Sequence, residues 1–127
     1  MTTPVYVSPF TGTVVTPTDV SYYALSFNSN TQLYWPSTVN QANNETPAAR
    51  IIDCFPSQAG LKIVLPPGNQ GSVGTDILFR NKGTYDFVVE DLSGDQSVTI
   101  GAGTARYFYL VDNSTEDGVY QNFTYGA

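Results

Sequence analysis

The chain has 127 residues, which is enough for one hydrophobic core and too few for two ordinary domains. Only 13% of the residues are charged, whereas 41% are apolar and 13% are aromatic. Thr, Ser, Asn and Gln supply much of the remaining polarity. This composition favours strands and turns over solvent-exposed helices, which are normally rich in Glu and Lys.

The net charge of −6 disfavours several classes of partner. The five basic residues are scattered along the chain, whereas phosphate contacts need a clustered basic stripe, so we expect no nucleic-acid binding. The same charge disfavours anionic membranes, and no apolar run approaches the roughly 20 residues that span a bilayer. The N-terminus lacks a basic region followed by an apolar run, so we expect no secretory signal peptide and synthesis in the cytoplasm.

The first third of the chain predicts three or four short strands. Runs of β-branched and aromatic residues alternate there with turns that contain Pro, Gly or Asn. A polar loop follows at Asn40–Pro47, with at most one turn of helix near Thr46–Ala49. The predicted strands lie at 5–7, 13–15, 20–27 and 31–35.

The rest of the chain predicts seven more strands. Leu61, Ile63 and Leu65 alternate with other residues, which is the period of a strand with one buried face. Asn81–Thr84 and Leu92–Asp95 read as tight hairpin turns, with a glycine available for positive φ. The predicted strands lie at 50–55, 61–65, 76–81, 85–90, 96–100, 105–111 and 119–125.

About ten short strands with frequent turns are typical of a sandwich or barrel. We therefore predict an all-β fold, namely an antiparallel, jelly-roll-like β-sandwich with little or no helix. Residues 1–127 should form this single domain.

The absence of histidine removes the usual general base and the commonest transition-metal ligand. No phosphate-binding loop or dinucleotide-binding motif is present. Cys54 is the only cysteine, which excludes an internal disulfide and a multi-cysteine metal site, and its apolar surroundings at Ile51–Phe55 predict burial. We predict a protein without catalytic activity, cofactor or metal.

The acidic residues leave two other functions open, a glycosidase and a calcium-binding site. A glycosidase needs only two carboxylates across a cleft, and Glu90 and Asp91 with Asp95 could chelate calcium, although they lack EF-hand spacing. Predicted loops and strand ends hold nearly all of these acids, where solvated side chains are the simpler interpretation. The carboxylate candidates are Glu45, Glu90 and Glu116 with Asp91 or Asp117.

Aromatic residues are the candidate interface. Neighbours on a strand point to opposite faces, so Tyr22-Tyr23 and Tyr107-Phe108-Tyr109 should display aromatic surface on one face if the other is core. Ordinary exposed tyrosines are the alternative. The candidate interface residues are Tyr22, Tyr23, Trp35, Tyr107, Tyr109 and Tyr120.

The second half resembles the amino-terminal domains of tailed-bacteriophage fibre, collar and related virion proteins. The most specific stretch is Tyr109–Gly118, which contains Asp-Asn-Ser-Thr, although Val119-Tyr120 stands where an aromatic, usually tryptophan, often follows the glycine. The first half is similar only at 17–23 and 33–36. Other matching stretches are Ile63–Pro66, Gly74–Phe79, Asn81–Gly83 and Val89–Gly94.

The resemblance implies a structural protein of the virion that anchors a fibre, spike or collar element to the capsid, portal or tail, commonly as a homotrimer. It implies no catalytic residues. Such proteins usually continue into further domains, so the chain is either the ordered amino-terminal part of a longer protein or a short stand-alone relative. Two alternatives stay open: a carbohydrate-binding or host-adhesion module that uses exposed aromatics, and a small glycosidase that uses Glu90 and Glu116.

Overall fold

The computed structural model describes residues 6–7, 14–15, 21–35 and 46–125. Within these ranges every predicted run contains a strand, which confirms the all-β prediction. The strands are β1 (Tyr6–Val7), β2 (Val14–Val15), β3 (Tyr22–Phe27), β4 (Thr31–Tyr34), β5 (Thr46–Pro47), β6 (Ile51–Pro56), β7 (Lys62–Val64), β8 (Asp76–Asn81), β9 (Phe87–Glu90), β10 (Ser97–Ile100), β11 (Ala105–Asp112) and β12 (Val119–Tyr125).

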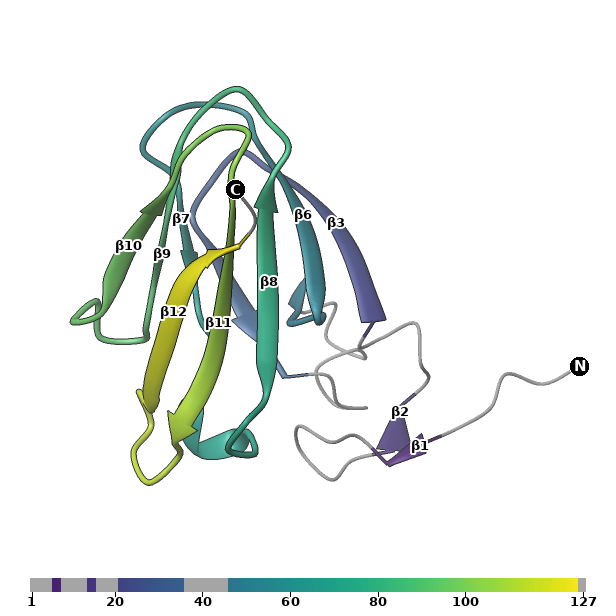
Figure 1. Ribbon diagram of the computed structural model, residues 1–127, viewed down its shortest axis with the longest axis vertical. Helices are drawn as coiled ribbons and strands as arrows, with labels where there is room; N and C mark the ends of the chain where they lie inside the picture. The colour runs from purple at the N-terminus through teal and green to yellow at the C-terminus, as the bar shows by residue number, and fades with distance from the viewer. Residues whose placement is uncertain (1–5, 8–13, 16–20, 36–45, 126–127) are drawn as a thin grey trace, which may run out of the picture.

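Two five-stranded sheets face one another (Figure 1). One has the order β12-β11-β8-β6-β3 and is called the β12–β3 sheet below. The other has the order β10-β9-β7-β4-β5 and is called the β10–β5 sheet. A separate two-stranded pair joins β1 to β2.

The prediction of antiparallel pairing is wrong for much of the fold. Strands β3, β6 and β8 run parallel to one another in one sheet, and β5, β4, β7 and β9 run parallel in the other. Only the β11 and β12 side of one sheet and the β9–β10 pair of the other are antiparallel. Both sheets are therefore mixed.

The connections between strands explain this mixture. The chain passes from the β12–β3 sheet to the β10–β5 sheet three times, after β3, after β6 and after β8. Between these passages it returns after β5 and after β7. Each passage lies beside the previous one and has the same direction. The strands that the passages connect therefore start at the same end of each sheet and run parallel. Alternating hydrophobicity identifies a buried face but not the direction of the neighbouring strand, and the sequence therefore left this arrangement hidden.

The two predicted hairpin turns have different outcomes. Leu92–Asp95 does join an antiparallel pair, β9 and β10, and Gly94 adopts the positive φ of 81° that such a turn favours. The prediction for Asn81–Thr84 is wrong, because this segment carries the chain from β8 to the other sheet. Gly83 is needed there for space, since a Cβ at this position would lie 2.9 Å from the Pro56 ring.

The predicted helical turn near Thr46–Ala49 is also wrong. Thr46 and Pro47 form β5, which pairs in parallel with Leu33 and Tyr34 of β4. A two-residue strand that contains proline carries no periodicity from which to recognise it. The one short helical segment among the described residues is a 3-10 turn at Gly68–Gln70, which the sequence analysis did not anticipate.

The core lies between the two sheets. Inward-facing residues alternate along the strands as predicted, and the rings of Phe27 and Phe87 meet edge to face across the sheets with centroids 5.7 Å apart. Cys54 is fully buried among them, which confirms its prediction, and burial raises the pKa of its thiol well above the ordinary value.

A polar link joins the two sheets near the start of β12. The Gln96 amide donates to Asp91 Oδ2 at 2.7 Å and to the Gly118 carbonyl at 3.1 Å. Its Oε1 accepts the Tyr120 N–H at 3.1 Å. Gln96 thus ties the β9–β10 hairpin of one sheet to the start of β12 in the other.

Asn81 is the buried polar residue that closes the passage from β8 to β9. It is 1% exposed, and its amide nitrogen donates to the carbonyls of Tyr85 at 2.8 Å and Ile100 at 3.0 Å. Its Oδ1 accepts the Gly83 N–H at 3.1 Å. One side chain therefore satisfies backbone groups from its own connection and a buried carbonyl at the end of β10.

We expect Asn81→Leu to lower the free energy of unfolding by about 2–4 kcal/mol, because one buried and two partly buried backbone groups would lose their partner. Urea denaturation at equilibrium measures this change. Asn69→Leu, at an exposed position of the 3-10 turn, is the matched control and should stay within about 0.5 kcal/mol of the unsubstituted protein. An equal loss in both variants would contradict the role assigned to Asn81.

Candidate functional site: an aromatic sheet face

One row of apolar and aromatic residues crosses the whole outer face of the β12–β3 sheet. The strand registers place Tyr22 beside Ile51, Ile51 beside Leu78, Leu78 beside Tyr107, and Tyr107 beside Phe123. Every strand of the sheet thus contributes one member. We call this row, with Tyr109 and Tyr125 beside it, the aromatic face.

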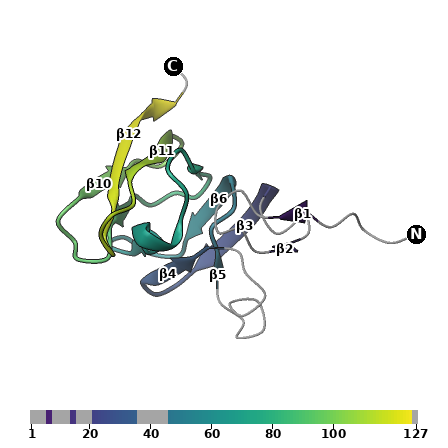
Figure 2. The ribbon, with the colours of Figure 1, turned by 90° about the horizontal axis from the view of Figure 1, so that it is seen from below.

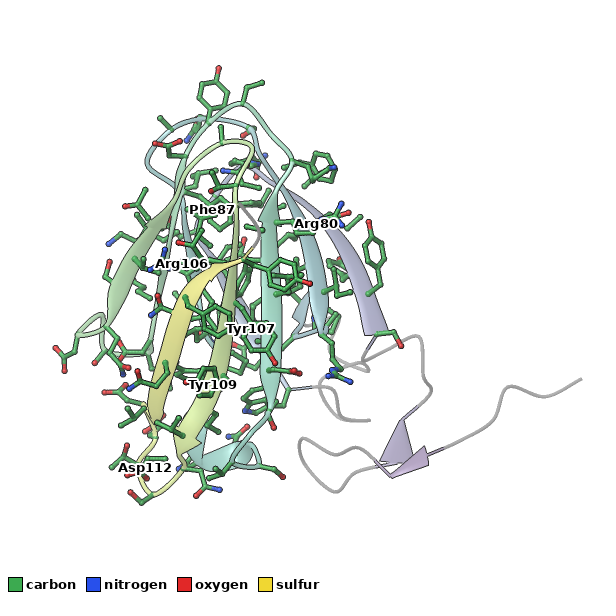
Figure 3. All side chains as sticks on the ribbon, viewed as in Figure 1. Arg80, Phe87, Arg106, Tyr107, Tyr109 and Asp112 are labelled. Atoms are coloured by element: carbon green, nitrogen blue, oxygen red, sulfur yellow. The ribbon has the colours of Figure 1, made fainter. Side chains whose placement is uncertain are left out.

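The rings at one end of the aromatic face contact one another. Tyr107 lies 5.2 Å from Phe123 and 6.2 Å from Tyr109 between ring centroids, and Tyr109 lies 6.3 Å from Phe123. Figure 3 labels Tyr107 and Tyr109 on β11. Phe123 keeps 49% of its surface exposed and Tyr125 keeps 55%, so the cluster offers apolar area to a partner.

A charged triad is set into this apolar surface. Arg50 binds Asp76 through two hydrogen bonds, Nε to Oδ1 at 2.9 Å and Nη2 to Oδ2 at 3.1 Å. The Tyr107 hydroxyl donates a short hydrogen bond to Asp76 Oδ2. Paired in this way, the carboxylate keeps its charge although its side chain is only 17% exposed.

The pKa values of all three members of the triad are shifted, and the hydrogen bond to Asp76 raises that of Arg50. Burial would raise the pKa of Asp76, but the hydrogen bonds from Arg50 and Tyr107 outweigh it and hold the pKa below its ordinary value. Burial and the bond to Asp76 raise the pKa of Tyr107 to about 12. Near neutral pH the triad therefore carries a carboxylate, a guanidinium and a neutral phenol.

A second ion pair lies in the next row of the same face. Arg80 Nε is 2.8 Å from Asp53 Oδ1, although its N–H is not aligned with that oxygen, so the contact is an ion pair without a well-formed hydrogen bond. Asp53 Oδ2 accepts the Tyr22 hydroxyl at 2.7 Å. Tyr22 therefore keeps its ring on the face while its hydroxyl is anchored.

The triad borders a shallow hollow of about 330 Å³. Its walls combine rings and aliphatic side chains with one carboxylate and one guanidinium, and rings beside paired polar groups suit either a protein side chain or the apolar face of a sugar. The lining residues are Ser21, Arg50, Ile51, Asp76, Leu78, Tyr107 and Tyr125.

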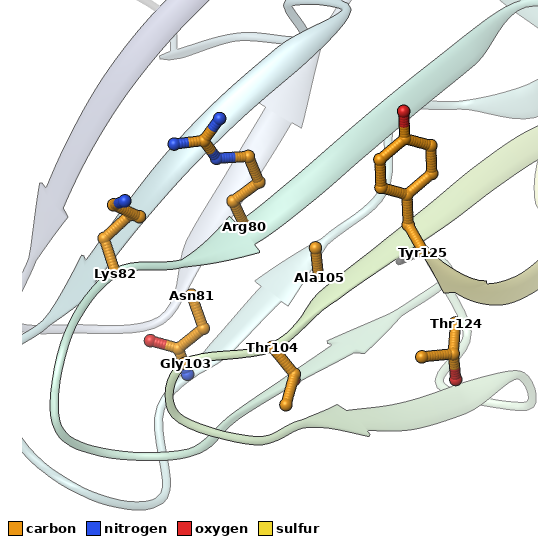
Figure 4. A pocket seen from close by; sticks show the side chains of 8 residues that line it. All are labelled: Arg80, Asn81, Lys82, Gly103, Thr104, Ala105, Thr124 and Tyr125. Atoms are coloured by element: carbon orange, nitrogen blue, oxygen red, sulfur yellow. The ribbon is translucent and has the colours of Figure 1, made fainter. Parts of the chain in front are cut away.

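A second hollow, of about 450 Å³, lies at the end of β8 (Figure 4). Most of its polar side chains already bind within the chain. Arg80 pairs with Asp53, the Asn81 amide is buried, and Thr124 Oγ1 accepts a hydrogen bond from Arg106. We therefore place the candidate site on the aromatic face.

Tyr22, Tyr107 and Tyr109, all predicted interface residues, lie on the aromatic face. Tyr22 is 50% exposed, whereas Tyr107 and Tyr109 are half-buried. Tyr23 points the other way and packs against the core. The rule that neighbours on a strand face opposite sides thus separates Tyr22 from Tyr23.

Trp35 and Tyr120 correct the prediction, because both lie in the core. Trp35 is 1% exposed, and its Nε1–H donates to the Pro67 carbonyl at 2.6 Å. Tyr120 is 6% exposed, and its hydroxyl donates to the Pro66 carbonyl at 2.8 Å. Each satisfies its polar atom inside the molecule, an outcome that composition alone does not reveal.

The sequence analysis missed Ile51, Leu78, Phe123 and Tyr125 as members of the face. The places of Phe123 and Tyr125 could have been predicted from the sequence, because their positions alternate with that of the inward-facing Tyr120 along β12. Ile51 and Leu78 did not, since their place in the row depends on the parallel register of β6 and β8.

The acidic candidates are dispersed among the described residues. Glu90 lies 3.5 Å from the Lys62 ammonium, and Asp91 is 1% exposed and bound by Gln96. Glu116 and Asp117 lie in the exposed turn before β12, and Glu45 falls outside the described residues. Within those residues no group of three His, Cys, Asp or Glu side chains is placed to hold a metal ion.

No helix in the described part of the chain is long and apolar enough to cross a membrane. Comparison with protein-family models, with curated proteins and with solved structures finds no match to this chain.

We expect Asp76→Asn to lower the free energy of unfolding by about 1–3 kcal/mol at neutral pH, because the charged acceptor for Arg50 and Tyr107 is lost. The folded pKa of Asp76 lies below the unfolded value of about 3.9, so this contribution is present above about pH 4 and is lost as the pH falls through the folded pKa. Urea denaturation at several pH values should therefore show the two proteins converging in acid. Asp95→Asn, in the exposed β9–β10 turn, is the control, and a gap that stays constant into acid would contradict the assignment.

Proposed function

We propose that this protein is a non-catalytic structural protein of a bacteriophage virion that docks onto other virion proteins through its aromatic face. The observation that carries the docking role is the row from Tyr22 to Phe123, which is apolar on all five strands. An apolar surface of this kind marks an interaction site rather than ordinary solvated sheet.

The distribution of exposed apolar side chains supports the choice of face. Nine large hydrophobic side chains are exposed among the described residues, and six of them lie on the outer side of the β12–β3 sheet. Those six are Tyr22, Ile51, Phe55, Val119, Phe123 and Tyr125. The ion pairs of Asp53 and Asp76 lie among them and would give a partner a fixed register, as paired charges do in interfaces.

The virion part of the proposal rests on the resemblance to fibre and collar proteins. That resemblance favours a homo-oligomer that anchors a fibre, spike or collar element to the capsid, portal or tail. In this proposal the two facing sheets act as a β-sandwich, with mixed sheets in place of the antiparallel ones of a jelly roll.

A carbohydrate-binding or host-adhesion module is the second candidate. The observation that favours it is the hollow beside Tyr107 and Tyr125, where rings flank the Arg50–Asp76 pair. A sugar could stack on a ring and exchange hydrogen bonds with the two charged groups. Here the same face would bind a glycan rather than a protein.

A docking measurement with purified capsids and tails that lack their appendages tests the first proposal. We expect the double substitution Ile51→Ser and Tyr109→Ser to weaken docking by about 10-fold or more, because it removes apolar side chains from two strands of the face. Tyr85→Ser is the matched control, since this tyrosine is 44% exposed but lies in the β8–β9 connection. Equal docking by all three proteins would overturn the assignment of the face.

Titration calorimetry against a panel of host polysaccharides separates the two candidates. A docking domain should give no heat, whereas a carbohydrate module should give heat that Arg50→Ala abolishes. Glycan binding without docking to any virion part would replace the first proposal by the second.

A further inference from the structure

Among the described residues, β12 forms an edge of the β12–β3 sheet with no strand paired to its outer side. It has seven residues, Val119–Tyr125, and none of them is Lys, Pro, Asp or Glu. Proteins commonly shield edges by charge, proline or shortness, and the edges of the other large sheet fit this rule, since β10 has four residues and β5 is Thr46–Pro47. The opposite edge of the same sheet, β3, keeps Leu25 and Phe27 in the core.

The second half of β12 is exposed on both faces, from Gln121 to Tyr125. Figure 2 shows this strand extending to one side of the body. No residue of the other sheet buries these five positions, so another strand could approach without displacing core side chains.

The hydrogen bonds of β11 show which backbone groups of β12 face the free edge. Leu110 donates its N–H to Thr75 and accepts the Gly74 N–H, so its backbone points to the β8 side. Directions alternate along a strand, so Tyr107 and Tyr109 point to β12, where the register pairs them with Phe123 and Gln121. The backbone groups of Tyr120, Asn122 and Thr124 therefore point to the open edge.

Gln96 determines where the open edge begins. The Tyr120 N–H points to the edge as expected, and it is already taken by Gln96 Oε1 at 3.1 Å. Asn122 and Thr124 keep their backbone groups at the edge, while Arg106 binds only their side chains, at 2.7 Å and 3.0 Å. The stretch ready for pairing is thus Gln121–Tyr125.

We infer that two copies of this chain associate through an antiparallel pairing of their β12 edges, centred on Phe123. In this register Asn122 and Thr124 of one copy exchange N–H···O=C bonds with Thr124 and Asn122 of the other. Phe123 lies directly opposite its own counterpart, and Gln121 lies opposite Tyr125. Outward-facing residues meet outward-facing residues, so the aromatic faces join into one continuous surface.

The distribution of charge limits the repulsion between two copies that each carry −6. The paired segment is uncharged, and the acidic turn that contains Glu116 and Asp117 precedes it. Asp117 is six residues from the two-fold axis, which is about 20 Å along a strand. The two acidic turns therefore lie about 40 Å apart at opposite ends of the pair, well beyond the Debye length of about 8 Å at physiological salt.

Cysteine cross-linking tests the register. Phe123→Cys should form a covalent dimer under mild oxidation with glutathione disulfide, because opposite residues of such a pair have Cα atoms about 4.5 Å apart, within disulfide range. Gln121→Cys should not cross-link to itself, since its counterpart lies about 13 Å along the strand. A mixture of Gln121→Cys and Tyr125→Cys should cross-link. The native Cys54 is buried, so the unsubstituted protein serves as the blank.

Light scattering after size-exclusion chromatography tests the contact without cross-linking. The unsubstituted protein should run as a dimer, and Asn122→Pro should run as a monomer, because proline removes the edge N–H without breaking a bond to β11. Asn122→Ala is the matched control, since it loses the Arg106 contact but keeps the N–H, and it should stay dimeric. Circular dichroism checks that both variants fold.

A monomer at every concentration, a trimeric mass, or equal cross-linking of Phe123→Cys and Gln121→Cys would overturn the inference. The pairing does not depend on the virion role. A dimer that fails to dock onto capsids and tails would leave the pairing intact and remove the proposed function, whereas docking by a monomer would do the reverse.

Discussion

The fold depends on the buried Asn81 side chain, which holds together the point where the chain leaves one sheet for the other. Its amide nitrogen donates to one carbonyl within that passage and to one at the end of β10, and its oxygen accepts the Gly83 N–H. An apolar residue there would leave these groups without this partner, at a cost of about 2–4 kcal/mol out of a net stability of about 5–15 kcal/mol for a typical domain. The β8–β9 passage is the last of the passages that set the parallel strands side by side, so the mixed topology rests on a polar residue.

The sequence predicted the strands and their buried faces well, but it did not predict how they pair. Alternation of Leu61, Ile63 and Leu65 reports only that one side of a strand is apolar. The same signal arises in a hairpin and in a passage between sheets, which is why the segment after Asn81 was assigned to a hairpin. The close approach of the Pro56 ring to Gly83 is a tertiary contact, so no local sequence pattern predicts it.

The aromatic face shows the same limit at the level of the site. Tyr107 and Tyr109 were identifiable because they flank a core phenylalanine on one strand. Ile51 became part of the face only when β6 paired in parallel with β8 at Leu78, a register between residues far apart in the sequence. The prediction for Trp35 was wrong in the opposite sense. Its large ring lies in the core, because its N–H finds a buried carbonyl there.

The polar links within the fold also decide which surfaces are open. Gln96 joins the two sheets by donating to the Gly118 carbonyl, and the same side-chain amide accepts the Tyr120 N–H at the edge of β12. One end of that edge is therefore closed by a contact that stabilises the fold, while the exposed end retains Asn122 and Thr124 with their backbone groups directed outward. Stability and association are thus separated along a single strand, because the part of β12 that packs against the hairpin is not the part that faces solvent on both sides.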